Sequence, residues 1–169
     1  AITGDIANNA SAVAAGDLTL TATADGGAIG ALGNDIEVTL SGTVTATAST
    51  GAGGIFVSEE FMVVNTIDAG DGAASLTSAT IEINAAVTGN GGISLIPDTN
   101  GTTIALNDAA GTFSLTETEL RFLASTGTVT IGRAGAGTGT ISIGSVGGID
   151  LATTETFSLS LVGTSSNVE

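Results

Sequence analysis

The sequence predicts an all-β protein folded as a β-solenoid, a stack of eight to nine coils of about 19 residues each. Three observations predict this fold: a strand-forming composition, an apolar–polar–apolar triplet that recurs at nearly constant spacing, and a second triplet within each repeat. We expect the whole chain, residues 1–169, to be a single solenoid segment, a fragment or repeating unit of a longer fibre.

The composition favours many short strands over helices. Hydrophobic residues make up 42% of the chain, yet the aromatic residues are five Phe, without any Tyr or Trp. The remaining apolar residues are mostly Ala, Val, Ile and Leu, punctuated by 26 Gly and many Thr and Ser. Such β-branched, Gly-punctuated sequences are typical of strands joined by tight turns. With a single Pro in the chain, Gly and Asn must make nearly all of these turns.

A first triplet opens each repeat, and successive triplets start about 19 residues apart, as expected for the coils of a solenoid. Seven of the eight middle residues are polar, which is the alternation of a half-buried strand. We therefore expect Ile36, Ile55, Ile93 and Ile149 to lie in one continuous column inside the stack. The triplets are Leu18-Thr-Leu20, Ile36-Glu-Val38, Ile55-Phe-Val57, Ala74-Ser-Leu76, Ile93-Ser-Leu95, Phe113-Ser-Leu115, Val129-Thr-Ile131 and Ile149-Asp-Leu151.

A second triplet follows each first triplet by roughly half a repeat, so that each repeat contains two strands. One coil buries four or five apolar side chains at roughly 1.5–3 kcal/mol each, whereas ordering its residues costs about 1–2 kcal/mol apiece. A single coil is therefore unstable, and stability must come from stacking. We expect uncapped ends that expose strand edges. The second triplets are Ile29-Gly-Ala31, Val44-Thr-Ala46, Met62-Val-Val64, Ile81-Glu-Ile83, Ile104-Ala-Leu106, Leu120-Arg-Phe122, Ile141-Ser-Ile143 and Phe157-Ser-Leu159.

The charge balance and the missing residue types exclude several classes of function. With 17 acidic and two basic residues the net charge is -15, and phosphate binding needs clustered Lys and Arg, so we expect no nucleic-acid partner. The chain has no His and no Cys, the usual general base, thiol nucleophile and transition-metal ligands. Carboxylates interrupt every apolar run short of the ~18 residues that a membrane span needs. We therefore expect a non-enzymatic protein without membrane insertion and without catalytic, cofactor-binding or metal-binding residues.

The chain's two cations and its paired carboxylates are interpreted as surface charge. Arg121 is expected on an outward strand position, near Glu119 and Glu82, where an exposed ion pair stabilises by about 0–1 kcal/mol; the alternative is an anchor for a ligand or carbohydrate. Arg133 is expected in a Gly-rich turn, facing carboxylates or solvent. Glu59-Glu60 and Glu117-x-Glu119 are expected to be solvated, because nothing forms the cleft that a carboxylate pair needs for glycosidic catalysis.

Two turns and several Thr-x-Thr runs offer further binding hypotheses. DAGDG (68–72) and PDTNG (97–101) place oxygen ligands on tight turns, where Ca²⁺ could bind and bridge neighbouring rods. Ordinary Asx turns are the simpler interpretation, so structural Ca²⁺ is kept as an alternative only. Thr-x-Thr runs at 19–23, 43–47 and 128–130 resemble ice-binding arrays, but the middle coils break the pattern, and the strand preference of Thr explains it.

The segment FSLTETELRFLASTGTVTIGRAGAGTGTISIG (113–144) resembles a recurring unit of the filamentous-haemagglutinin-like giant exoproteins of Gram-negative bacteria, and GTVTATASTGAGGIFVSEE (42–60) resembles another. The resemblance implies a right-handed parallel β-helix, export by two-partner secretion through an outer-membrane pore, and adhesion or matrix formation at the cell surface. The amino-terminal secretion domain of that family is not visible in this chain. The matching residues are Leu115, Thr116, Glu119, Leu120, Gly127, Thr128, Ile131, Gly132, Gly139, Ile141 and Ile143.

Together these features predict a structural, non-catalytic shaft of an extracellular adhesin or biofilm-matrix filament, secreted to the cell surface. Its coils would continue or stack end to end, so its partners are other copies of itself and host-cell or matrix glycans. One alternative is a pilin-like subunit that polymerises by donating its N-terminal strand, residues 1–15, to a neighbour. Another is a carbohydrate-active β-helix such as a lyase, which the lack of Lys, His, Tyr and Trp disfavours.

Overall fold

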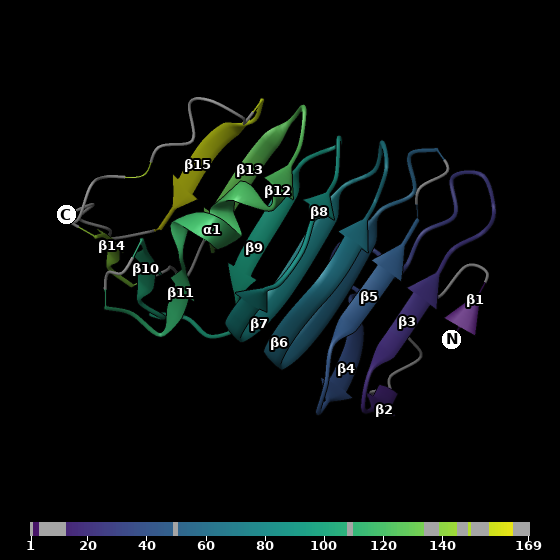
Figure 1. The fold of residues 1–169 in the computed structure, drawn as a ribbon, viewed down its shortest axis with the longest axis horizontal. Helices are drawn as coiled ribbons and strands as arrows, with labels where there is room; N and C mark the ends of the chain where they lie inside the picture. The colour runs from purple at the N-terminus through teal and green to yellow at the C-terminus, as the bar shows by residue number, and fades with distance from the viewer. Residues whose placement is uncertain are drawn as a thin grey trace.

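The structure, a computed structural model, describes residues 2–3, 13–48, 51–107, 110–133, 139–144, 149 and 156–163. It is mostly β-structure, with one short helix in these residues, α1 (Glu117–Arg121), and it confirms the predicted all-β class (Figure 1). The strands are β1 (Ile2–Thr3), β2 (Val13–Ala15), β3 (Leu18–Thr21), β4 (Ile36–Leu40), β5 (Val44–Thr47), β6 (Ile55–Asp68), β7 (Ala74–Ile83), β8 (Val87–Thr88), β9 (Ile93–Pro97), β10 (Ile104–Leu106), β11 (Phe113–Leu115), β12 (Leu123–Ala124), β13 (Thr128–Gly132), β14 (Ile141–Ile143) and β15 (Ser158–Val162).

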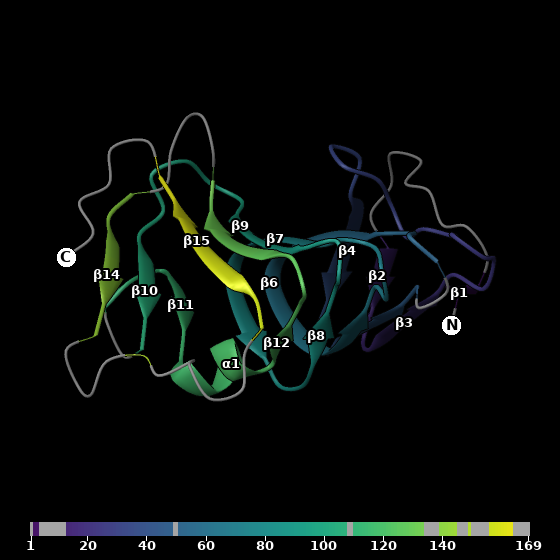
Figure 2. The same ribbon diagram turned by 90° about the horizontal axis from the view of Figure 1, so that it is seen from above.

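The main sheet runs in chain order, β1-β3-β5-β6-β7-β9-β13-β15, and β2, β4, β8 and β12 pair beside this path. Every pairing between these strands is parallel, so the chain returns to the same end after each strand. The view from above shows β4, β7 and β9 on one side of the molecule and β3, β8 and β12 on the other (Figure 2). The strands of this main sheet therefore lie on two sides of a buried interior.

The predicted column of apolar side chains is present in the middle of the molecule. Ile55 pairs with Ala74 and Ala74 pairs with Ile93, so that each step covers one repeat of about 19 residues. Val129 of β13 pairs with Ile93 and continues the column. All four side chains are at most 1% exposed. The prediction that Ile55 and Ile93 share a column is thus confirmed.

The other two members of the predicted column take different places. Ile36 pairs with Val57, the next inward position along β6, and is 3% exposed. Ile149 lies outside the described strands and packs, partly buried, against the core; the rest of its triplet lies outside the described residues. The prediction is therefore wrong for these two residues: Ile36 pairs one inward position away from Ile55, and Ile149 is not in a strand.

The spacing between paired strands is not constant near the N-terminus. Leu18 pairs with Val44, a step clearly longer than one repeat, whereas the next step, from Val44 to Val64, is again close to one repeat. The sequence analysis placed Leu18 in the first series of triplets and Val44 in the second, so the two were not expected to pair. This assignment is wrong, because residues 22–35 form a long connection between β3 and β4. Ile29, expected in a strand, forms only an isolated bridge to Ile55.

Part of the chain between β9 and β13 leaves the main sheet. β10, β11 and β14 form a separate three-stranded parallel sheet in the order β11-β10-β14 (Figures 1 and 2). Phe113 accordingly pairs with Ile104, although its spacing placed it between Ile93 and Val129. The step from Ile93 to Val129 is therefore close to two repeats, and one expected member of the column is missing from it.

The predicted strand around Leu120 is instead the helix α1. Thr116 is its N-cap: the Thr116 Oγ1 accepts a hydrogen bond of 3.2 Å from the Glu119 N–H. In return the Glu119 Oε2 accepts a 2.8 Å hydrogen bond from the Thr116 N–H, which completes a capping box. The buried Leu120 faces the core from this helix. The local cap overrides the apolar–polar–apolar pattern that suggested a strand.

Glycine-containing turns before successive strands repeat with the same step as the strands. The Gly91 N–H donates a 2.9 Å hydrogen bond to the Gly72 carbonyl oxygen, one repeat earlier. A Cβ at Gly72 would overlap the backbone of Gly53, another repeat earlier, and a Cβ at Gly53 would overlap that of Gly27. Glycine is required at these positions because successive turns approach more closely than a side chain allows.

Candidate binding groove

Arg121 forms a surface ion pair, although with a different partner from the one predicted. Its Nη2 lies 2.6 Å from the Glu117 Oε1, one helical turn away, and both side chains are about one-third exposed. Glu119, the expected partner, instead accepts a 3.0 Å hydrogen bond from the Ile83 N–H through its Oε1. Glu119 thereby ties the capped helix to the end of β7. Arg121 and Glu117 contribute surface charge, as expected for an exposed pair.

Arg133 contacts two carbonyl groups at the end of a neighbouring strand. Its Nη1 donates hydrogen bonds of 2.9 Å and 2.7 Å to the carbonyl oxygens of Pro97 and Asp98. These two residues lie at the end of β9, whereas Arg133 directly follows β13. The guanidinium therefore fastens the ends of two neighbouring strands.

Of the two adjacent carboxylates at 59 and 60, only Glu60 is exposed, so the prediction that both are solvated is wrong for Glu59. Glu59 is 5% exposed, and its Oε1 accepts a 2.7 Å hydrogen bond from the Leu40 N–H. Burial raises the pKa of Glu59, and the hydrogen bond from Leu40 partly opposes that rise. The Glu59 Oε2 and the Ser78 Oγ, on paired positions of β6 and β7, are buried without a hydrogen-bond partner.

In the two acidic turns, 68–72 and 97–101, the Asp side chains accept hydrogen bonds from nearby backbone and side-chain groups. The Asp68 Oδ1 accepts a 3.0 Å hydrogen bond from the Gly70 N–H, and the Asp71 Oδ1 accepts one of 3.0 Å from the Asn90 side chain. In the second turn the Thr99 hydroxyl donates to the Asp98 Oδ1 at 2.8 Å. Within the described residues no three His, Cys, Asp or Glu side chains gather as a metal site would require.

Two of the Thr-x-Thr runs lie side by side, which the sequence did not reveal. Thr19 pairs with Thr45 and Thr21 pairs with Thr47 on neighbouring strands β3 and β5. The next strand, β6, continues one row with Thr66 beside Thr45 and ends the other with Asp68 beside Thr47. Strand preference remains a sufficient explanation of these threonines.

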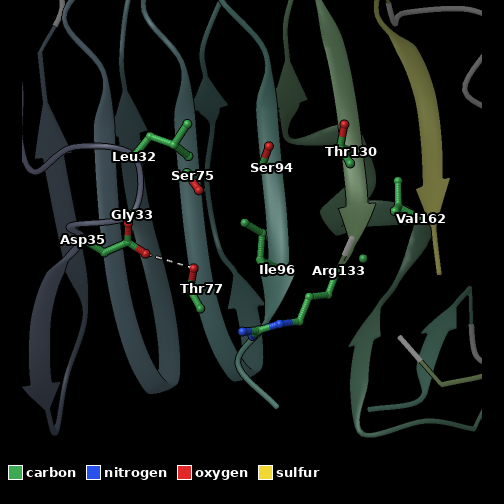
Figure 3. A pocket seen from close by; sticks show the side chains of 11 residues that line it. Leu32, Gly33, Asp35, Ser75, Thr77, Ser94, Ile96, Thr130, Arg133 and Val162 are labelled. Atoms are coloured by element: carbon green, nitrogen blue, oxygen red, sulfur yellow. Dashed lines mark hydrogen bonds between the residues drawn. The ribbon is translucent and has the colours of Figure 1, made fainter. Parts of the chain in front are cut away.

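A groove lies on the outward face of β7, β9, β13 and β15 (Figure 3). Its floor holds a row of three hydroxyl side chains at paired positions: Ser75 pairs with Ser94, and Ser94 pairs with Thr130. All three are the middle residues of sequence triplets, which alternation turns away from the core. Paired strands are about 4.8 Å apart, so the row offers one hydroxyl per strand.

One wall of the groove is the connection that lengthens the coil between β3 and β5. Leu32 stands at the tip of a tight turn closed by the Ala31–Asn34 bridge, and it is 84% exposed. Gly30 has a φ of +72°, and a Cβ there would approach the Phe56 carbonyl oxygen to 2.6 Å, so glycine lets this connection lie close to β6. The Asp35 Oδ2 accepts a 3.1 Å hydrogen bond from the Thr77 hydroxyl and holds the segment against β7.

Two overlapping hollows make up the groove. One, of about 480 Å³, extends toward the ends of the strands, where Thr77, Gly132 and Arg133 line it. The other, of about 590 Å³, extends toward the starts of the strands and reaches Phe56 and Gly91. Both are within the range of small-molecule sites. The residues that line both hollows are Leu32, Ser75, Ser94, Ile96 and Thr130.

Asp35 and Arg133 are the charged residues that line the groove. Burial raises the pKa of Asp35, the hydrogen bond from Thr77 lowers it, and the nearby Glu37 carboxylate raises it further. A polar hollow of about 290 Å³, lined by Asp35, Glu37 and Ser58 among others, adjoins the groove. The sequence already marked Ser75, Ser94 and Thr130 as outward positions, but no local signal linked them to Leu32 and Asp35, because those contacts depend on how the long connection folds back.

Searches against protein-family models, curated proteins and solved structures found no match for this chain. None of the helices in the described part of the chain is long and apolar enough to cross a membrane.

Proposed function

We propose that the chain is a right-handed parallel β-helix that serves as the structural, non-catalytic shaft of an extracellular bacterial adhesin or matrix filament. One observation carries the proposal: inward side chains and turn glycines both recur once per repeat through consecutive coils. Ile55, Ala74 and Ile93 stack inside, while Gly53, Gly72 and Gly91 stack at the turn. A repeat that includes strands and turns alike is typical of solenoids.

The contacts between coils support a role based on length and stiffness. β6 and β7 pair over nine positions at a constant offset, from Ile55 with Ala74 to Val64 with Ile83. Each coil supplies the hydrogen-bonding edge and the apolar layer on which the next coil packs. Because this interaction is local and repetitive, further coils can extend the shaft without a change of design.

The charge of the chain suits a filament outside the cell. A net charge of -15 with no Lys keeps neighbouring rods apart and leaves trypsin-like proteases only two cleavage sites. Divalent cations such as Ca²⁺ would reduce the repulsion between rods and favour lateral contacts. The proposed partners are therefore other copies of the chain, with glycans at the host surface or in the matrix as targets of the filament.

Electron microscopy and fibre diffraction of the native assembly test the proposal. We expect thin rods whose long axis lies across the strands, with an axial repeat of about 4.8 Å from the stacked coils. Compact particles without this axial repeat would contradict the filament. Incubation with acidic and neutral polysaccharides should release no oligosaccharide, since the function proposed is not catalytic.

The second candidate is polymerisation by strand donation from residues 1–15. In the structure, β1 and β2 pair within their own chain, with β3 and β4 respectively. This intramolecular pairing favours stacking over donation. Deletion of residues 1–15 distinguishes the two, because polymerisation should stop under donation and largely persist under coil stacking.

A further inference from the structure

The groove beside Leu32 is built from groups that suit a ligand rich in hydroxyls. Ser75, Ser94 and Thr130 lie on adjacent strands in one row, and each hydroxyl can both donate and accept a hydrogen bond. A ligand hydroxyl has the same dual capacity. A row of such groups across the floor therefore matches a chain of hydroxyl groups better than it matches a purely anionic or purely cationic ligand.

Apolar surface alternates with this polar row. Ile96 lies two residues beyond Ser94 on β9, and Val162 lies on β15 at one side of the groove. Leu32 stands beside Ser75 at the other side (Figure 3). Phe56 lines the far end of the groove, where it is partly exposed. Pyranose rings present hydroxyls at their edges and C–H groups on their faces, so they meet both kinds of surface.

The charges around the groove disfavour a polyanion. The chain carries a net charge of -15, and Asp35 and Glu37 lie at this edge of the sheet. The Arg133 side chain, which extends toward Thr77 in Figure 3, already donates to two carbonyl groups. A carboxylate such as that of Asp35 accepts hydrogen bonds from sugar hydroxyls without requiring a charged partner.

The backbone of the strands in the groove floor has no free hydrogen-bonding edge to which a peptide strand could add. β7, β9 and β13 each have a paired strand on both sides, so their backbone N–H and C=O groups are used within the sheet. Peptides that bind sheets usually add to an unpaired edge. A ligand in the two hollows, of about 480 and 590 Å³, therefore finds no unpaired strand edge on β7, β9 or β13.

We propose that this groove binds a neutral oligosaccharide, with sugar hydroxyls on Ser94, Thr130 and Asp35 and with ring faces against Leu32 and Ile96. The site lies on one chain and does not depend on filament formation. If no oligosaccharide bound, the proposed shaft would therefore be unaffected. If no filament formed, binding at the groove could still be tested.

Titration of the isotope-labelled chain, followed by two-dimensional amide NMR, tests the site. The neutral probes are oligomers of glucose and xylose; fragments of heparin, oligomers of glucosamine and a Gly/Ser peptide provide the charged and peptide comparisons. We expect at least one neutral oligosaccharide to shift the amide resonances of Ser94, Thr130 and Ile96 in a saturable manner. The proposal is overturned if no neutral probe does so, or if only a charged probe or the peptide does.

Matched variants locate the binding. Ser94→Ala and Thr130→Val each remove one hydroxyl with little change of shape, so each should weaken binding about 2- to 10-fold. Thr45→Val, on β5 outside the groove, removes a hydroxyl of the same kind and should leave the affinity unchanged. Thermal unfolding of all three variants checks that the fold is retained. Equal affinities for the groove variants and the control would place the ligand elsewhere and refute the assignment.

Discussion

Substitution of a turn glycine tests the stacking of coils most directly. A Cβ built at Gly72 would lie 2.5 Å from the Gly53 carbonyl carbon and nearer still to its oxygen, whereas ordinary contact begins at 3.4 Å. Gly72→Ala must therefore separate the two turns by more than about 0.9 Å. The neighbouring atoms belong to the backbone and cannot rotate away. The Ile55 N–H donates to the Ala73 carbonyl at 2.8 Å beside this contact, and the same separation would stretch that bond beyond hydrogen-bonding range.

The expected cost follows from these two effects. Loss of one hydrogen bond costs about 0.5–1.5 kcal/mol, and overpacking a close contact adds about 1–3 kcal/mol. We therefore expect Gly72→Ala to lower the free energy of unfolding by about 2–4 kcal/mol, measured by urea denaturation followed by circular dichroism. Hydrogen exchange of the Ile55 amide should accelerate as well.

Gly16→Ala is the matched control, because a Cβ at Gly16 has no atom within 4 Å and its backbone is not left-handed. We expect this variant to change the free energy of unfolding by no more than about 0.5 kcal/mol, or to stabilise slightly through the unfolded chain. If Gly72→Ala and Gly16→Ala unfold at the same urea concentration, the coils do not approach as closely as described, and the argument for a solenoid loses its main support.

Three further substitutions probe the core, a buried carboxyl and the helix. Ile93→Ala, at a fully buried position, should lower the free energy of unfolding by about 2–5 kcal/mol in the same urea assay. Burial raises the pKa of Glu59, so the protonated side chain contributes its full stability below the ordinary pKa of a glutamate, and this contribution is lost as pH rises through the raised pKa of Glu59 in the folded protein. The melting temperature should therefore fall with pH in this range, and Glu59→Gln should make that fall smaller. An unchanged fall in the variant would contradict the assignment. Glu119→Ala should destabilise by about 1–2 kcal/mol through loss of the capping box and of the bond to β7, whereas Arg121→Met should cost less than about 1 kcal/mol; equal losses in urea would contradict these roles.

The sequence predicts the strands better than it predicts their partners. Period-two alternation identifies Ile55 and Ile93 as inward residues, and the regular spacing puts them in one column. Spacing alone fails at Leu18, because the partner of a strand depends on the length of the connection, and a connection longer by several residues brings a different triplet alongside. The same alternation, continued along β6 past Val57, already places Glu59 inward, so its burial was predictable.

Other features depend on information that periodicity does not contain. The helix α1 has a local signal, the Thr116–Glu119 capping box, which is readable in sequence and outweighs the triplet around Leu120. For the groove, the sequence indicates only the outward-facing residues of its floor, through the alternation of apolar and polar residues. Asp35 reaches Thr77, which lies on a strand of a later coil, and nothing in the sequence around either residue indicates that contact.

The groove and the regular part of the main sheet have a common origin in the spacing of the paired strands. Where the step is one regular repeat, as from Ile55 to Ala74, the chain is fully used in strands and stacked turns, and the outer face stays flat. Where the step is longer, as from Leu18 to Val44, the additional residues fold back over β7 as the wall that carries Leu32 and Asp35. Binding surfaces in scaffold proteins generally lie on such connections, because a rigid framework positions them and tolerates their variation. In the proposed shaft, coils of constant length would hence provide stiffness alone, whereas the longer coil would form the groove in which we propose that a ligand binds.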